Sequence, residues 1–170
     1  MIIREAKTND SNGIARVIVD TWRSTYSGIM PQEFLDNMSY RKAKRIFDEA
    51  IKRRDRISLV VENLLGEIVG IAEGGKEREG YKNYQGEIYA IYILKEYQKK
   101  GLGKKLIHRM IKEFIHEDIS SMIIWVLEDN SSRKFYEKLG GISKEVKYSK
   151  IGQKRLKEIG YIWNELKDEL

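Results

Sequence analysis

The chain has 170 residues, a formal net charge of +6 and no cysteine. A chain of this length buries roughly 70% of the surface that its unfolded form exposes, which is enough for one core, and no repeat or low-complexity run marks a boundary, so we expect a single domain over residues 1–170. The absence of cysteine excludes disulfides, thiolate metal sites and a cysteine nucleophile.

Targeting and membrane segments are not recognisable in the sequence. No signal sequence precedes Ile2, and no apolar run approaches the roughly 20 residues that span a bilayer. We therefore expect a cytoplasmic protein without a membrane partner. The tail Lys167–Leu170 matches an endoplasmic-reticulum retention tag, and we interpret this match as coincidental.

The first part of the chain contains two predicted helices and a predicted hairpin. Residues 31–38 and 41–54 are each predicted to be helical, and the second combines apolar residues at helical spacing with many lysines and arginines. We favour a solvated helix face over a nucleic-acid patch, so nucleic acid is not an expected partner. Residues 58–62 and 67–73 then predict a β-hairpin across Asn63–Gly66.

A predicted strand, a glycine-containing loop and a predicted helix come next. The continuous β-branched and aromatic run 88–94 is typical of a strand covered on both faces. After Gln98, the apolar residues of 104–117 recur at helical spacing, so Gly101 and Gly103 lie at a helix entrance. The first N–H groups of a helix are unpaired and attract anions. A third glycine at dinucleotide-fold spacing and a P-loop are both missing, so NAD and ATP are not favoured.

A second strand and helix follow the same order. Residues 122–127 predict another buried strand, and Asn130 is a plausible N-cap for a helix from about 131 to 139. This helix contains Phe135 and Tyr136.

Two separate segments resemble one protein family. The spacing Gln98-x-x-Gly101-x-Gly103 after an apolar strand resembles the acyl-CoA pyrophosphate loop of the GNAT superfamily of N-acetyltransferases. The helix segment Phe135-Tyr136-x-x-x-Gly140 resembles the helix after that superfamily's fifth strand. The resemblance implies an α/β fold with a single central mixed sheet of about seven strands, flanked by about four helices and splayed between strands 4 and 5.

The resemblance extends to both ends of the chain. Residues 2–6 are similar to the family's first strand and residues 8–25 to its first helix, while 142–150 and 154–165 supply two closing strands. Residues 22–29 are similar to a Trp-x-x-Thr-Tyr-x-Gly-Ile turn of small bacterial members, which include some polyamine acetyltransferases. A homodimer through the closing strands is compatible with this resemblance, although no residue pattern specifies it.

The resemblance also implies a reaction and a co-substrate. It implies that the protein transfers an acetyl group from acetyl-CoA directly to a primary amine, without a metal. Main-chain groups of the strand would pair with the pantetheine arm, and the loop would bind the pyrophosphate. The implied cofactor-binding residues are Ile91, Tyr92, Ile93, Gln98, Lys99, Lys100, Gly101, Leu102, Gly103, Lys104 and Asn130.

Amide formation requires a base for the ammonium group of the acceptor and an acid for the departing thiolate. Glu87 is the candidate base, because strict alternation places it on the same side of the strand as Ile91 and Ile93. Glu73 is the next candidate. The family motif implies that Tyr136 donates the proton to the thiolate.

The acceptor is less defined than the co-substrate. Trp22, Tyr26 and Tyr89, together with Glu73 and Glu87, are candidates for an aromatic and acidic pocket that suits an amine cation. A small amine or polyamine is favoured, and a protein N-terminus or lysine and an aminoglycoside are alternatives. The alternative of another class is a regulatory module that binds acyl-CoA, nucleic acid or a protein partner without catalysis.

Overall fold

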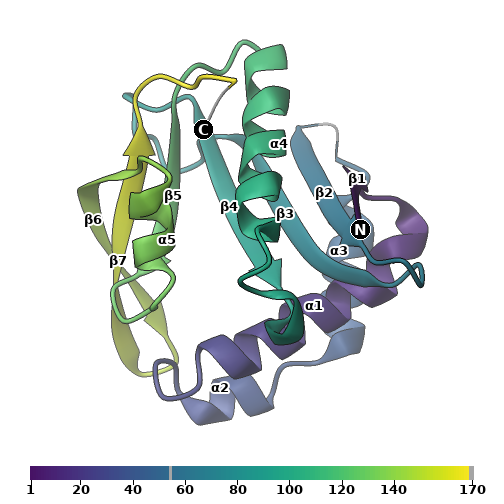
Figure 1. Ribbon diagram of the computed structural model, residues 1–170. Coiled ribbons are helices and arrows are strands. Elements are labelled where there is room, and N and C mark those ends of the chain that lie inside the picture. Colours follow the sequence, from purple (N-terminus) through teal and green to yellow (C-terminus); the bar gives the residue numbers. More distant parts are fainter. Residues whose placement is uncertain (54, 169–170) are drawn as a thin grey trace.

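The computed structural model describes residues 1–53 and 55–168, and within them seven strands form one mixed sheet (Figure 1). The strand order is β1-β2-β3-β4-β5-β7-β6. The pair β4 and β5 is parallel, and the other neighbouring pairs are antiparallel. The bounds are β1 Ile2–Glu5, β2 Arg56–Glu62, β3 Ile68–Lys76, β4 Gly86–Ile93, β5 Met122–Leu127, β6 Ile142–Ile151 and β7 Lys154–Trp163. This sheet confirms the predicted fold class.

Five α-helices are described, where about four were expected. Their bounds are α1 Ser11–Thr25, α2 Gln32–Asp36, α3 Tyr40–Ala50, α4 Leu102–His116 and α5 Arg133–Lys138. The predicted helix 41–54 corresponds to α3, and its last residue, Arg54, lies outside the described residues. The prediction that Asn130 is the N-cap of α5 was wrong. The N-cap is Ser132, and the Asn130 side chain accepts a hydrogen bond from the Ser132 N–H at 2.9 Å.

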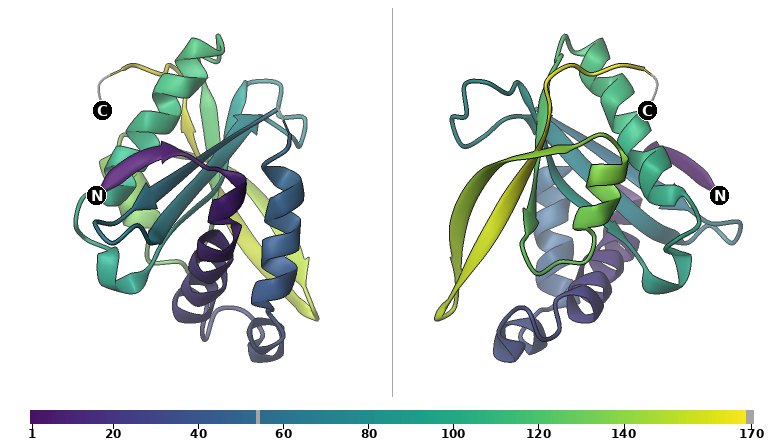
Figure 2. Two further views of the ribbon diagram at one scale, coloured as in Figure 1. Left: turned by 90° about the vertical axis from the view of Figure 1, so that its right-hand side faces the viewer. Right: turned by 60° about the vertical axis from the view of Figure 1, so that its left-hand side comes forward.

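Helices α1 and α4 lie on opposite faces of the sheet. A Cβ on Gly74 of β3 would lie 2.9 Å from Met110 Sδ of α4. On the other face, Trp22 of α1 contacts Tyr92 of β4 with ring centroids 6.2 Å apart. The two views of Figure 2 show the sheet between α4 on one side and α1 with α3 on the other. A passage through the sheet would therefore connect the α4 side to the α1 side.

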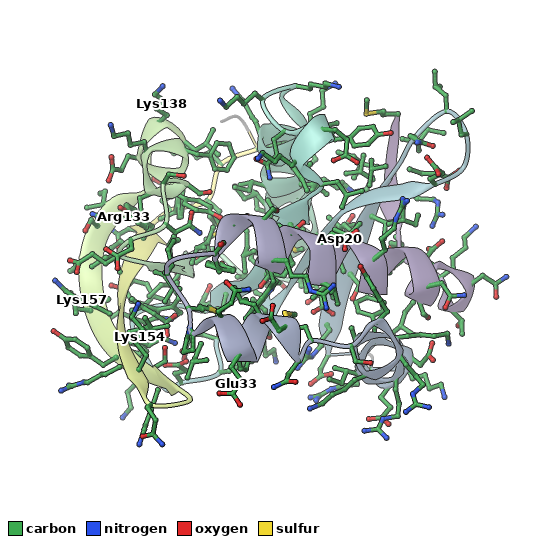
Figure 3. All side chains as sticks on the ribbon, turned by 90° about the horizontal axis from the view of Figure 1, so that it is seen from below. Asp20, Glu33, Arg133, Lys138, Lys154 and Lys157 are labelled. Atoms are coloured by element: carbon green, nitrogen blue, oxygen red, sulfur yellow. The ribbon has the colours of Figure 1, made fainter. Side chains whose placement is uncertain are left out.

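Strands β4 and β5 separate after a short pairing. Their parallel register joins residues 86–88 only with residues 122–124, and the two ribbons diverge beyond this point (Figure 1). At the open end, Leu127 of β5 packs with Trp22 and Tyr26 of α1 in an apolar cluster. Lys154 Nζ of β7 donates to the Ile29 carbonyl at 2.5 Å, and Figure 3 shows this end of β7 beside the α1–α2 connection. The expected splay is confirmed.

A β-bulge in β4 lies beside the splay. Consecutive β3 residues Glu73 and Gly74 pair with Ala90 and Ile88, so Tyr89 is an extra residue on β4. A bulge of this kind interrupts the alternation of side chains along a strand.

The bulge changes which β4 residues share a face. Glu87 pairs with Gly75 and Tyr92 pairs with Ile71, and these two β3 positions lie on the same face. Glu87 therefore shares the α1 face with Tyr92. The expectation that it lies on the side of Ile91 was wrong, because strict alternation holds only without a bulge.

Candidate active site

A cavity of about 480 Å³ occupies the gap between β4 and β5. It is lined by β4 and β5, by the glycine loop that precedes α4, and by side chains of α1 and α5. Within the described residues, its lining includes no aspartate or glutamate. Because α1 and α4 lie on opposite faces, this cavity passes through the sheet.

Most of the predicted cofactor-binding residues line this cavity. Lys100 and Leu102 do not: Lys100 Nζ lies 5.3 Å from the centroid of the Tyr97 ring, and the Leu102 side chain is buried in the core. A contribution of Leu102 therefore comes from its main chain. The lining members are Ile91, Tyr92, Ile93, Gln98, Lys99, Gly101, Gly103, Lys104 and Asn130.

The glycine loop presents unpaired backbone N–H groups. Lys99 and Gly101 have left-handed backbone conformations, with φ of 59° and 79°. In the described part of the chain, the N–H groups of residues 99–104 donate to no protein acceptor. The Gln98 amide braces the loop, since its Nε2 donates to the Ile93 carbonyl at 2.9 Å. Successive free N–H groups before a helix form a concave site for an anion.

Gly103 sits where the loop meets α5. A Cβ at this position would lie 2.9 Å from Cζ of Phe135. A larger residue would therefore displace the Phe135 ring, which itself lines the cavity.

Tyr136 lines the cavity from α5, and its ring packs against two aromatic side chains. Its side chain is buried, and its ring centroid lies 5.2 Å from that of Phe135 and 6.0 Å from that of Tyr161. Arg133 Nε donates to the Tyr161 hydroxyl at 3.0 Å; Arg133 and Lys138 mark the two ends of α5 in Figure 3. Burial raises the pKa of the Tyr136 phenol, so it stays protonated at neutral pH and can donate a proton.

The Glu87 carboxylate forms an ion pair with the Arg78 guanidinium. Its side chain is only 2% exposed and does not line the cavity. Arg78 donates Nη2–H to Oε1 at 2.8 Å and Nε–H to Oε2 at 3.1 Å, and its backbone N–H also donates to Oε2, at 3.3 Å. The two oxygens of this carboxylate therefore already accept three hydrogen bonds.

Glu73 is in a different environment on the same face. Its register partner Ala90 lines the cavity, and Ser58 Oγ donates to Glu73 Oε1 at 3.4 Å. Among the described residues, no salt bridge involves Glu73. Burial raises the pKa of this carboxyl, and the nearby Arg56 charge opposes the rise. A raised pKa makes the ionised carboxylate a stronger proton acceptor than an ordinary glutamate.

The predicted acceptor residues divide into two groups. Tyr26 and Tyr89 line the cavity, whereas Trp22 and Glu73 do not. Trp22 packs behind the wall, with its ring centroid 5.1 Å from that of Tyr26. The Arg78 guanidinium lies 3.6 Å from the centroid of the Tyr89 ring. Arg78 therefore contacts both the Tyr89 ring, which lines the cavity, and the Glu87 carboxylate.

Three residues near the site gave no recognisable signal in the sequence. Thr21 lies on a helix and Trp125 within a continuous apolar strand, where each is expected to be core, yet both line the cavity. Arg78 lies in a loop of mixed polar residues. Phe135, in contrast, belongs to the quoted helix motif and could have been selected from it.

No helix in residues 1–53 and 55–168 is both long and apolar enough to cross a bilayer. Over the same residues, no group of three or more His, Cys, Asp or Glu side chains is arranged to hold a metal ion.

The chain is similar in sequence to known N-acetyltransferases. The acetyltransferase (GNAT) family matches residues 17–141. The uncharacterised N-acetyltransferase YuaI of Bacillus subtilis (strain 168) is 35% identical over 165 residues, which cover 96% of this chain and 93% of that protein.

Two solved structures share the fold. The PaiA N-acetyltransferase of Thermoplasma acidophilum, in complex with coenzyme A, has a TM-score of 0.74 at 23% identity, covering 92% of this chain and 96% of that chain. YncA of Salmonella typhimurium, described as a putative acetyltransferase and solved with acetyl-CoA, has a TM-score of 0.74 at 22% identity, covering 98% of this chain and 94% of that chain.

Proposed function

Because the chain belongs to the GNAT family and is an acetyl-CoA-dependent N-acetyltransferase, we propose that it transfers the acetyl group directly to the primary amine of a small molecule. The observation that carries this proposal is the cavity between β4 and β5, which joins the glycine loop, Tyr136 and the α1 face. Direct transfer requires both substrates to meet in one space.

Acetyl-CoA supplies an activated acetyl thioester, and the chain offers groups that fit it. The unpaired N–H groups of residues 99–104 suit the pyrophosphate, and Lys99 and Lys104 add positive charge at the same end of the cavity. The main chain of residues 91–93 pairs with β3 on one side and lies beyond the last β4–β5 pair on the other. The Ile93 carbonyl accepts from Gln98, so the remaining main-chain groups on the β5 side are those that suit the amide groups of the pantetheine arm.

The side chains divide the proton transfers between them. We assign the base to Glu73, directly or through water, because Glu87 is held by Arg78 and Glu73 is not. Tyr136 is the acid, since its protonated phenol faces the cavity and can deliver a proton to the thiolate. Tyr136 lines the cavity from α5, and Glu73 lies on β3 as the register partner of Ala90, which lines the cavity.

Substituting Gly103 by valine is expected to weaken CoA binding far more than substituting Lys99 by alanine. Valine would press on Phe135 and fill the space beside the loop, which predicts a loss of roughly 10- to 100-fold in affinity. Lys99 contributes charge at an exposed position, so Lys99→Ala is expected to cost about fivefold or less. Calorimetric titration with CoA measures both. Equal affinities of the two variants would contradict the loop assignment.

The proposed function is tested by acetyl-CoA turnover, followed as release of free thiol. The acceptor panel contains polyamines, amino acids, amino-acid amides, aminoglycosides and peptides with a free N-terminus. Turnover with at least one small amine is the expected result. CoA binding without turnover on any acceptor would instead favour a regulatory acyl-CoA-binding protein, and absence of CoA binding would refute the assignment.

A further inference from the structure

Building on the proposed function, we propose that Arg56 and Arg78 are positioning residues of the reaction: they hold the bulged Tyr89 ring in the cavity wall and keep the neighbouring Glu73 ready to accept a proton. The Arg56 guanidinium lies 5.2 Å from the centroid of the Tyr89 ring, and that of Arg78 lies 3.6 Å from it. Cations at such distances are attracted to an aromatic ring. The Tyr89 hydroxyl donates to the Lys76 carbonyl at 2.7 Å. Because Tyr89 lines the cavity, the contacts that fix its ring also fix part of the site.

A glycine beside this ring brings the participating groups onto one face of the sheet. A Cβ on Gly75 would lie 2.6 Å from the Tyr89 hydroxyl oxygen, so the hydroxyl end of the ring lies directly over Gly75. Arg56 of β2 and Glu87 of β4 are the two register partners of Gly75, and Glu73 precedes it by two positions along β3. Register partners and residues two positions apart share a face. Arg56, the Glu87 ion pair and the proposed base therefore lie together on the α1 face.

The two arginines place positive charge beside Glu73. Burial raises the pKa of the Glu73 carboxyl, and the Arg56 charge, a hydrogen bond from Ser58 and the Arg78 charge oppose the rise. In the described part of the chain, Arg56 forms no salt bridge, whereas Arg78 is paired with Glu87. A nearby positive charge favours the ionised carboxylate, which is the form that takes a proton from the acceptor amine.

The other charged groups around this face have partners of their own. Asp55, whose carbonyl oxygen would lie 2.8 Å from a Cβ on Gly75, is paired with Arg53. The Tyr92 phenol on the same face is neutral, because burial raises its pKa. The three charged side chains of α1 bond to groups outside this cluster, Arg16 to the carbonyl of residue 68, Asp20 to the hydroxyl of Tyr40, and Arg23 to the carbonyls of residues 35 and 38. The charges next to Glu73 are therefore those of the two arginines and of Glu87.

The test measures the pH profile of kcat/KM for Arg56→Gln, Arg78→Gln and Glu87→Gln, with an acceptor that the wild type acetylates. Loss of either arginine charge favours protonated Glu73, so the acid limb of both arginine variants is expected to move to higher pH by about 0.5 to 1 pH unit. Glu87→Gln leaves the Arg78 charge uncompensated, so its acid limb is expected to move to lower pH. The ionisation of the acceptor itself is the same in every profile. A purely structural role would lower activity without opposite movements of the limb.

Two further variants separate charge from folding and from the position of the ring. Arg78→Gln leaves a buried carboxylate without its partner, so the double variant Arg78→Gln/Glu87→Gln removes both charges together, and its acid limb is expected to lie between those of the two single variants. Arg78→Lys keeps the charge but loses the planar fork and the stacking on Tyr89. We expect its acid limb to stay near that of the wild type, while KM for the acceptor rises about three- to tenfold. Thermal unfolding of each variant monitors the fold.

Each outcome bears on the inference. Acid limbs that move up in Arg56→Gln and down in Glu87→Gln, with the double variant between the single ones, support it. Limbs that stay at the wild-type position in Arg56→Gln and in the folded Arg78 variants overturn it, and an unchanged KM in Arg78→Lys overturns the part that concerns Tyr89. Both results leave the N-acetyltransferase function intact, because it depends only on turnover by the wild type. Wild-type protein that acetylates no amine overturns the proposed function and the inference with it.

Discussion

Tyr136→Phe is expected to lower kcat for acetyl transfer by about 100- to 10,000-fold, the usual contribution of a positioned general acid. The phenol lines the cavity, and burial raises its pKa, so at neutral pH it holds the proton that the departing thiolate needs. Phenylalanine keeps the ring between Phe135 and Tyr161 and removes only the hydroxyl. CoA affinity is therefore expected to stay within about threefold of the wild type, because the lost group acts on the reacting sulfur and not on the phosphates.

Tyr161→Phe is the matched control for this variant. Tyr161 stacks on Tyr136 but its hydroxyl pairs with Arg133 and Glu137 instead of lining the cavity. We expect it to reduce kcat by less than about tenfold, through loosened packing beneath Tyr136. Similar losses in the two variants, with thermal stability retained, would show that the ring environment and not the Tyr136 proton controls the reaction.

The elements of this fold could be predicted because each has a local signature. The apolar runs 88–94 and 122–127 both contain strands, and the helical spacing after Gly103 became α4. The second strand is buried except at Trp125, whereas residues 89–93 of the first are only partly buried because they line the cavity. The parallel pairing of these two strands and the splay came from the family resemblance, since nothing in either run specifies where pairing stops. The structure places that limit at Ile88 and Ile124.

The site was predictable only where it depends on local sequence. The glycine loop and the Phe135-Tyr136 helix are short segments whose function lies in their own spacing. The bulge at Tyr89 is set by the register against β3, and no pattern in β4 alone reveals it. For the same reason the Arg78–Glu87 ion pair, which links a loop to a buried strand residue, could not be foreseen. Long-range contacts of this kind determine that Glu87 has a salt-bridge partner and that Glu73, within the described residues, has none.

Glu73→Gln is expected to lower kcat/KM by about 100- to 10,000-fold at neutral pH, whereas Glu87→Gln is expected to lower it far less. Glutamine is nearly isosteric but cannot take a proton from the acceptor amine. In the wild type, kcat/KM should rise with pH through the raised pKa of Glu73, and this acid limb should be absent in Glu73→Gln. A pH profile of kcat/KM for both variants measures the effect. An unchanged acid limb in Glu73→Gln would exclude this residue as the base.

Thermal stability separates catalysis from folding in this pair of variants. Because burial raises the pKa of Glu73, its contribution to stability is full below the ordinary glutamate pKa and is lost as pH rises through the raised pKa. Glu73→Gln removes that loss, so at neutral pH the variant is expected to be at least as stable as the wild type. Glu87→Gln instead breaks a charged pair in which the carboxylate is buried and Arg78 half-exposed, which predicts a destabilisation of about 1–3 kcal/mol. If Glu73 is the base and Glu87 is part of a structural ion pair, Glu73→Gln is less active but at least as stable as the wild type, and Glu87→Gln is active but less stable. The reverse pattern would exchange the roles of the two residues.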